Sequence, residues 1–221
     1  IELDKTLEIE GCEIKATKMY VSPYQISLSF RNDLSKTVKI GELEYYPVTL
    51  MTISTDYLRT AYEHSERLKT DIYWIPPETY VYGDWKTKAE LDYEAETRAE
   101  HKKIWDEQGQ EAAAEYRSSR NIFKTDIYKE IESIRQNPEY FDMLDAASYK
   151  IGVEFAPGTE ASLIGTSFGQ AGKGGTDGTE EYAAAFADAY IDRPVSLDEI
   201  QRIYLYKYSD PTVQVDVWVN K

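Results

Sequence analysis

A short segment of the chain matches the motif that carries the nucleophile of many serine hydrolases. Gly165-Thr166-Ser167-Phe168-Gly169 has the spacing G-x-S-x-G, in which a strand-to-helix turn exposes the serine. That chemistry also needs a histidine later in the chain, and both histidines, His64 and His101, precede Ser167. The glycines that follow are poor helix formers. We therefore predict no catalytic residue, and an esterase that acts through Ser167 is the weakest interpretation of the sequence.

Three other patterns that could bind a ligand also fall short. Gly172-Lys173-Gly174 has the lysine of a phosphate-binding loop, but not the Ser or Thr that must follow it. The acidic segment 177–181 lacks the alternating acids of a calcium-binding loop. The two histidines do not have the spacing of metal ligands, and Cys12 is the single cysteine of the sequence. We predict no metal, no cofactor and no internal disulfide.

Aromatic side chains give the sequence its most useful chemistry. The chain contains 19 tyrosines, and on a strand Tyr204, Tyr206 and Tyr208 would share one face while the residues between them face the core. Exposed rings of this kind can stack on sugars or dock a protein. We predict these three tyrosines and Trp74 as binding residues. In the alternative interpretation the rings only cover the sheet beneath a helical segment.

The charge balance excludes two classes of partner. The sequence has 40 acidic and 25 basic residues, a net charge of −15. This excess repels nucleic acid and anionic membranes, so we expect neither as a direct partner. No run approaches the roughly 18 apolar residues of a membrane helix. Because the chain opens with Ile1 and no signal peptide, we expect any membrane anchor to lie outside it.

Alternating apolar residues predict β-strands at both ends of the chain. Near the start, Ile26, Leu28 and Phe30 alternate with serines. Turns are predicted before this strand, at Glu10-Gly11 and Ser22-Pro23, and after it, at residues 31–33. The clearest strand lies near the end, where we predict one buried face of Val213, Val215, Val217 and Val219. Further strands are predicted at 47–54, 149–155, 161–164 and 203–208, and a glycine-rich loop at 165–178.

Between these strands the composition changes to good helix formers. Residues 86 to about 120 are rich in Ala, Glu, Lys, Arg and Gln and have only a thin apolar stripe. A second helix follows and ends at Asn137-Pro138. Because the stripe is too thin for a separate core, we predict a single domain, 1–221, with a helical insertion over about 86–147. Near the end, Ser196 and Glu199 predict a capping box.

Two segments together resemble a known family. The first is Glu8-Ile9-Glu10-Gly11-Cys12-Glu13-Ile14-Lys15, followed by Val21-Ser22-Pro23 and the strand from Gln25 to Phe30. The second is Asp192-Arg193-Pro194-Val195-Ser196-Leu197-Asp198-Glu199-Ile200-Gln201-Arg202-Ile203. They are similar to the opening strands and the closing segment of the extracellular domain of DUF4179-type, anti-sigma-factor-like membrane proteins of Firmicutes. The resemblance implies an immunoglobulin-like sandwich outside the membrane, tethered by an upstream transmembrane helix, and it supplies no catalytic residues.

We therefore expect an α+β protein, an immunoglobulin-like antiparallel β-sandwich with a long helical insertion. The expected function is non-enzymatic binding or sensing of an unknown protein or cell-wall ligand, at the extracellular face of a Gram-positive cell membrane. The alternative is a carbohydrate-binding module that uses its exposed Tyr and Trp, or a carbohydrate-active module that uses two carboxylates.

Overall fold

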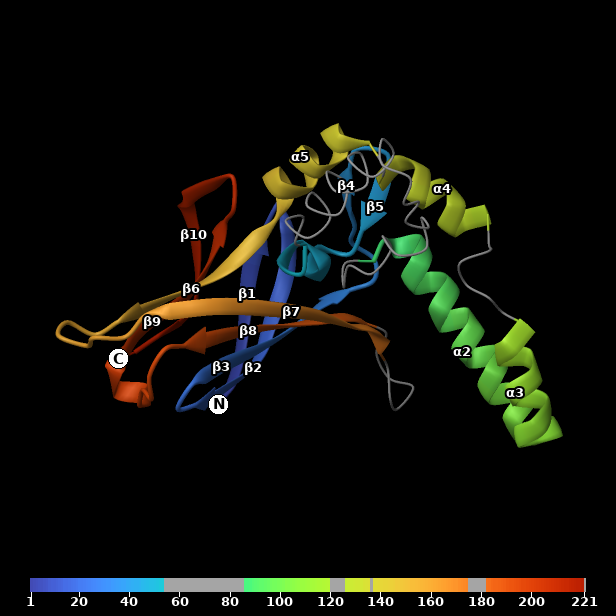
Figure 1. The fold of residues 1–221 in the computed structure, drawn as a ribbon, viewed down its shortest axis with the longest axis horizontal. Helices are drawn as coiled ribbons and strands as arrows, with labels where there is room; N and C mark the ends of the chain where they lie inside the picture. The colour runs from blue at the N-terminus through green and yellow to red at the C-terminus, as the bar shows by residue number, and fades with distance from the viewer. Residues whose placement is uncertain (54–85, 120–125, 136, 175–181, 221) are drawn as a thin grey trace, which may run out of the picture.

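The computed structural model describes residues 1–53, 86–119, 126–135, 137–174 and 182–220, which form an α+β fold (Figure 1). The larger sheet has five strands in the order β1-β2-β3-β8-β7. All of its pairings are antiparallel. Its strands are β1 (Glu2–Ile9), β2 (Cys12–Ser22), β3 (Gln25–Asp33), β7 (Leu163–Gly174) and β8 (Tyr182–Ile191).

A smaller antiparallel sheet has the order β10-β9-β6, and a separate hairpin pairs β4 with β5. The chain therefore passes from the smaller sheet to the larger one after β6, and returns to the smaller one after β8. The bounds are β4 (Val38–Ile40), β5 (Leu43–Tyr45), β6 (Tyr149–Phe155), β9 (Ile200–Lys207) and β10 (Asp210–Val219).

Both sheets contribute to one hydrophobic core, which includes Leu28 and Ala187 from the larger sheet and Ile151 and Leu205 from the smaller one. The alternation predicted near the start is confirmed, because Ile26, Leu28 and Phe30 are all buried. The buried valine face predicted for β10 is wrong. Only Val217 is fully buried there, and Val213 and Val219 are exposed. The pairing of β10 with β9 shifts register twice, and each irregularity moves the side chains that follow relative to the core.

Two other predicted elements differ from the structure. The run at 47–54, predicted as a strand, begins with the short 3-10 helix η1 (Pro47–Met51), whose residues are all buried. Residues 31–33, predicted as a turn, continue β3. Buried Asn32 accepts a hydrogen bond from the backbone N–H of Val48 (3.2 Å), which ties η1 to β3. A segment buried on every side has no polar face, so its period is hidden in the sequence.

The helical block contains α2 (Lys88–Gln108), α3 (Gln110–Ser119), α4 (Asp126–Arg135) and α5 (Pro138–Ala147). The single helix predicted up to about residue 120 is thus two helices, separated at Gly109, whose φ of 91° favours glycine. Asn137 caps α5 by accepting a hydrogen bond from the N–H of Glu139 (3.1 Å). Figure 1 shows α2 and α3 extending away from the sheets. None of the helices in the described part of the chain is long and apolar enough to span a bilayer.

Candidate functional site

The outward surface of the larger sheet carries a group of aromatic and polar side chains that we call the aromatic face. Strand register places these residues together. Tyr20 on β2 lies opposite Ser27 on β3, and Ser27 lies opposite Asp188 on β8, which in turn pairs with Ser167 on β7. Phe186 and Tyr190 flank Asp188 on the same side of β8. The aromatic face thus comprises Tyr20, Ser27, Ser167, Phe186, Asp188 and Tyr190.

The three rings of the aromatic face are exposed to solvent. Tyr20 is 67% exposed, Phe186 42% and Tyr190 37%. The ring of Phe186 lies over Gly169 of the neighbouring strand, because a Cβ atom at position 169 would be only 2.1 Å from the ring Cζ. The glycine backbone supports one side of this ring, as in other cross-strand aromatic–glycine pairs. Large rigid rings on a sheet lose little conformational entropy on binding, so this arrangement suits a contact surface.

Polar groups occupy the space among these rings. The hydroxyl of Ser167 lies 3.3 Å from Asp188 Oδ2, to which it donates, and 3.1 Å from the hydroxyl of Tyr190. Gln25 donates from Nε2 to the hydroxyl of Ser27 (3.1 Å). Ser167 lies within β7 and not on a strand-to-helix turn, so the geometry that makes such a serine nucleophilic is missing. The glycine-rich loop predicted from residue 165 is wrong as far as residue 174, where the chain forms β7.

The structure places Tyr204 and Tyr206 on the outward side of the smaller sheet, and Tyr208 in the turn directly after β9. We call these three residues the tyrosine row. Tyr208 is 43% exposed, while the other two are half-buried. The ring centroids of Tyr204 and Tyr206 are 6.1 Å apart, and the guanidinium of Arg202 lies 4.3 Å from the Tyr204 centroid. Burial raises the pKa of Tyr206 above its ordinary value. Trp74, the fourth predicted binding residue, lies outside the described residues.

Neighbours on the same surface constrain the tyrosine row. The Lys150 ammonium lies 5.4 Å from the Tyr208 ring centroid and 5.4 Å from that of Phe168, and it donates to the Ile53 carbonyl (2.6 Å). A Cβ atom at Gly152 would be 2.4 Å from Tyr204 Cζ, so the Tyr204 ring packs on that glycine. Tyr204 and Tyr206 are thus less exposed than the rings of the aromatic face, whereas Tyr208 is about as exposed as Phe186.

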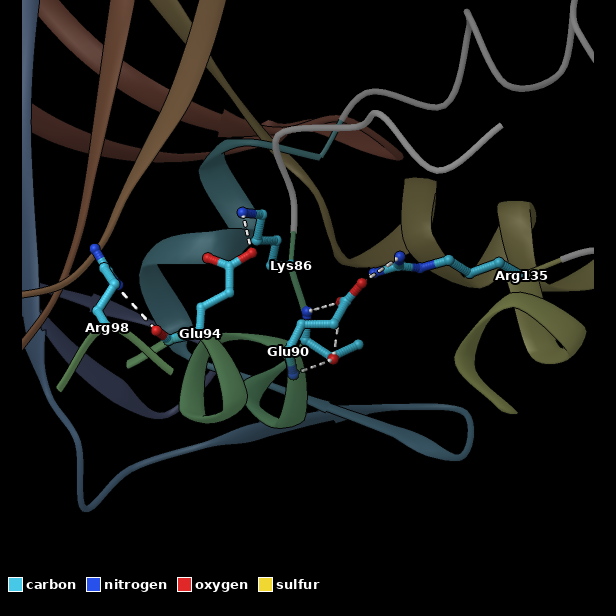
Figure 2. Close-up of polar contacts among 6 residues, drawn as sticks. Lys86, Glu90, Glu94, Arg98 and Arg135 are labelled. Atoms are coloured by element: carbon cyan, nitrogen blue, oxygen red, sulfur yellow. Dashed lines mark hydrogen bonds and ion pairs between the residues drawn. The ribbon is translucent and has the colours of Figure 1, made fainter. Parts of the chain in front are cut away.

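A buried ion pair connects the helices to one another (Figure 2). Arg135, the last residue of α4, donates from Nη1 and Nη2 to the two carboxylate oxygens of Glu90 in the first turn of α2, at 3.0 and 2.8 Å. The Glu90 side chain is 2% exposed and that of Arg135 12%. Glu90 also accepts from the backbone N–H of Thr87 (2.6 Å) and completes a capping box with it. Both carboxylate oxygens of Glu90 and both terminal nitrogens of Arg135 therefore form hydrogen bonds within the fold.

The same region contains two buried tyrosines that connect the helices to the β4–β5 hairpin. The hydroxyls of Tyr45 on β5 and Tyr140 on α5 are 2.8 Å apart. Burial raises the pKa of both phenols, so both stay protonated at neutral pH. Buried hydrogen-bonded groups of this kind stabilise a unique arrangement of the elements. We interpret the Glu90–Arg135 pair and the Tyr45–Tyr140 pair as structural.

Comparison with known proteins adds no family to this description. No protein-family model matches the chain, and neither a curated protein nor a solved structure shows significant similarity to it. The fold and the surface therefore define the class of protein: an α+β protein that displays an aromatic face on its larger antiparallel sheet.

Four residues of the candidate site were not predicted from the sequence: Tyr20, Phe186, Asp188 and Tyr190. No strand was predicted for residues 182–191, although every second residue from Ala183 to Ile191 is apolar and buried in β8. That alternation could have predicted the strand. It is hard to recognise because alanine has low β-propensity and because residues 182–187 are all apolar, so that no polar residue marks the outward side.

Proposed function

We propose that this chain is the extracytoplasmic, non-enzymatic binding or sensing domain of a membrane-anchored, anti-sigma-factor-like surface protein, and that the aromatic face is its binding surface. The observation that carries the proposal is the exposure of Tyr20, Phe186 and Tyr190 around hydrogen-bonded polar groups on one side of a sheet. Exposed apolar groups that lie together and are rimmed by polar residues are typical of binding surfaces.

The immunoglobulin-like sandwich and the membrane anchor in this proposal rest on the two segments that resemble the DUF4179-type domain. These segments meet in space although they lie near opposite ends of the chain. The N–H of Val195, in the closing segment, donates to the carbonyl of Pro23, in the opening segment (2.8 Å). Beside this contact, the N–H of Ile191 donates to the carbonyl of Tyr24 (2.9 Å). This contact supports one structural unit built from both segments, as the resemblance implies.

The binding proposal can be tested on intact Gram-positive cells. A fluorescently labelled domain should bind them saturably in flow cytometry, and the Tyr20→Ala/Phe186→Ala double variant should lose that binding. Tyr208→Ala is the matched control, because it removes an exposed ring from the other sheet. Absence of saturable binding would contradict the proposal. If Tyr208→Ala lost binding and the double variant kept it, the binding surface would be the tyrosine row and the aromatic face would be excluded.

The anchor has a separate test in the native gene. We expect the coding region upstream of Ile1 to encode a transmembrane helix and a short cytoplasmic segment. An upstream region without a membrane span would contradict the anchored form of the proposal.

A further inference from the structure

We propose that the ligand of the aromatic face is a neutral polysaccharide. This inference rests on the proposed function, since it names the ligand class for the same surface. The sequence predicted that such a ligand would bind at the tyrosine row. We propose that it binds on the outward side of the larger sheet instead.

The arrangement of the rings fits an extended ligand that presents flat apolar surfaces. Phe186 and Tyr190 are four residues apart on β8, a separation of roughly 13 Å. Tyr20 lies across the sheet from the midpoint between them. Tyr20 pairs with Ser27, and Ser27 pairs with Asp188, which is halfway between the two rings on β8. With Gly169 supporting one side of the Phe186 ring, the opposite side is left for a ligand. The C–H surface of a sugar ring can stack on such a side with little rearrangement of the protein.

The polar groups among the rings favour a sugar over a protein. The centre of a protein–protein contact is depleted of charged groups, and an apolar anchor pressed onto Asp188 and Ser167 would leave polar groups buried without new partners. A sugar carries hydroxyls that both donate and accept. It can donate to the remaining lone pairs of the Asp188 carboxylate and exchange hydrogen bonds with the hydroxyls of Ser27 and Tyr190.

Charge selects a neutral polysaccharide over an anionic one. The chain has a net charge of −15, and the acidic side chain of Asp188 lies at the centre of the aromatic face. Lys18 pairs with Ser29, which pairs with Phe186, so Lys18 lies beside the aromatic face. It forms an ion pair with Glu2 (3.3 Å), which partly neutralises its charge. Lys15 and Arg31 also lie on this side of the sheet, where Arg31 pairs with Ala184, on the far side of Phe186 from Asp188. At the centre of the aromatic face the carboxylate and the net charge of the chain therefore disfavour an anionic polymer, whereas a neutral one meets no electrostatic barrier.

Affinity electrophoresis tests this inference directly. The 221-residue chain is run in native gels that contain soluble β-glucan, xylan, mannan or galactan, with polygalacturonate as the anionic comparison. We expect at least one neutral polysaccharide to retard the protein. Tyr20→Ala and Phe186→Ala should each weaken the retardation about tenfold, the effect of an ordinary aromatic hot spot. Asp188→Asn should weaken it while it keeps the shape of the side chain, and Tyr208→Ala should leave it unchanged. Equal urea midpoints show that the variants are folded.

Three outcomes would overturn the inference. In the first, no neutral polysaccharide retards the protein. In the second, polygalacturonate retards it at least as strongly as any neutral polysaccharide does. In the third, the aromatic-face variants are retarded as strongly as the unmodified protein. If the labelled domain still binds cells through Tyr20 and Phe186 while no neutral polysaccharide retards it, the ligand class is wrong and the binding proposal stands. If cell binding is also insensitive to these rings, both fail.

Discussion

Replacing Arg135 by methionine should destabilise the protein strongly, because it leaves the Glu90 carboxylate buried without its cation. Both side chains are almost fully buried, and the pair is bidentate at 3.0 and 2.8 Å. Removal of one partner from such a pair costs about 3–5 kcal/mol. For a chain of this size each kcal/mol lowers the melting temperature by about 2–4 °C, so Arg135→Met should lower it by roughly 6–20 °C.

Urea and thermal unfolding followed by circular dichroism at 222 nm measure this change. The control is Lys102→Met, which removes the cation of an exposed pair with Asp106 whose side chains are 77% and 57% exposed. That variant should cost less than about 0.5 kcal/mol. The Glu90→Gln/Arg135→Met double variant removes both charges and leaves an oxygen to cap Thr87, so it should be more stable than Arg135→Met alone. A loss below about 1 kcal/mol for Arg135→Met, or a double variant less stable than that single variant, would show that Glu90 does not depend on Arg135 for its charge compensation.

Two further predictions concern the sheets and the closing segment. Gly152→Ala should cost about 1–3 kcal/mol in urea unfolding, because its Cβ would be 2.4 Å from Tyr204 Cζ, whereas Gly165→Ala, with nothing within 4 Å, should be neutral or slightly stabilising. Hydrogen bonds from Arg193 and Ser196 lower the pKa of Glu199 from 4.5 to about 2. Its contribution to stability is therefore present above pH 4.5 and lost as the pH falls toward 2. The melting temperature of Glu199→Gln should lie below that of the unmodified protein at pH 6, and the difference should shrink over that acidic range; a difference that stays constant would contradict the assignment.

Local patterns in the sequence predicted much of the fold. The turns at Glu10-Gly11 and Ser22-Pro23 bound β2, because glycine accepts positive φ and proline cannot donate within a ladder. Strand β6 has the predicted bounds, and Glu199 accepts from the N–H of Ser196 (2.9 Å), as the capping box predicts. Each of these features depends on residues close together in the chain, which is why the sequence alone is sufficient for them.

The remaining elements depend on contacts between distant segments. Strand β7 includes several glycines that disfavour a strand on their own, and pairing with β8, where Phe186 covers Gly169, stabilises it. The buried partners Glu90 and Arg135 lie on different helices, so no local pattern predicts their contact.

The candidate site required the same long-range information. The tyrosine row could be predicted because Tyr204 and Tyr206 alternate on β9 and Tyr208 follows its last residue. The aromatic face could not, since Tyr20, Ser167 and Phe186 come from three strands whose order in the sheet differs from their order in the sequence. The pairing of β3 with β8 brings them together, and this pairing joins segments more than a hundred residues apart.

Hydroxyl-radical footprinting of the labelled domain bound to Gram-positive cells tests the central claim most directly, because it reports which rings a ligand covers without any substitution. If the aromatic face is the binding surface, binding should protect Tyr20, Phe186 and Tyr190 from oxidation and leave Tyr208 as reactive as in the free protein. Protection of Tyr208 with unchanged oxidation of the aromatic face would contradict it.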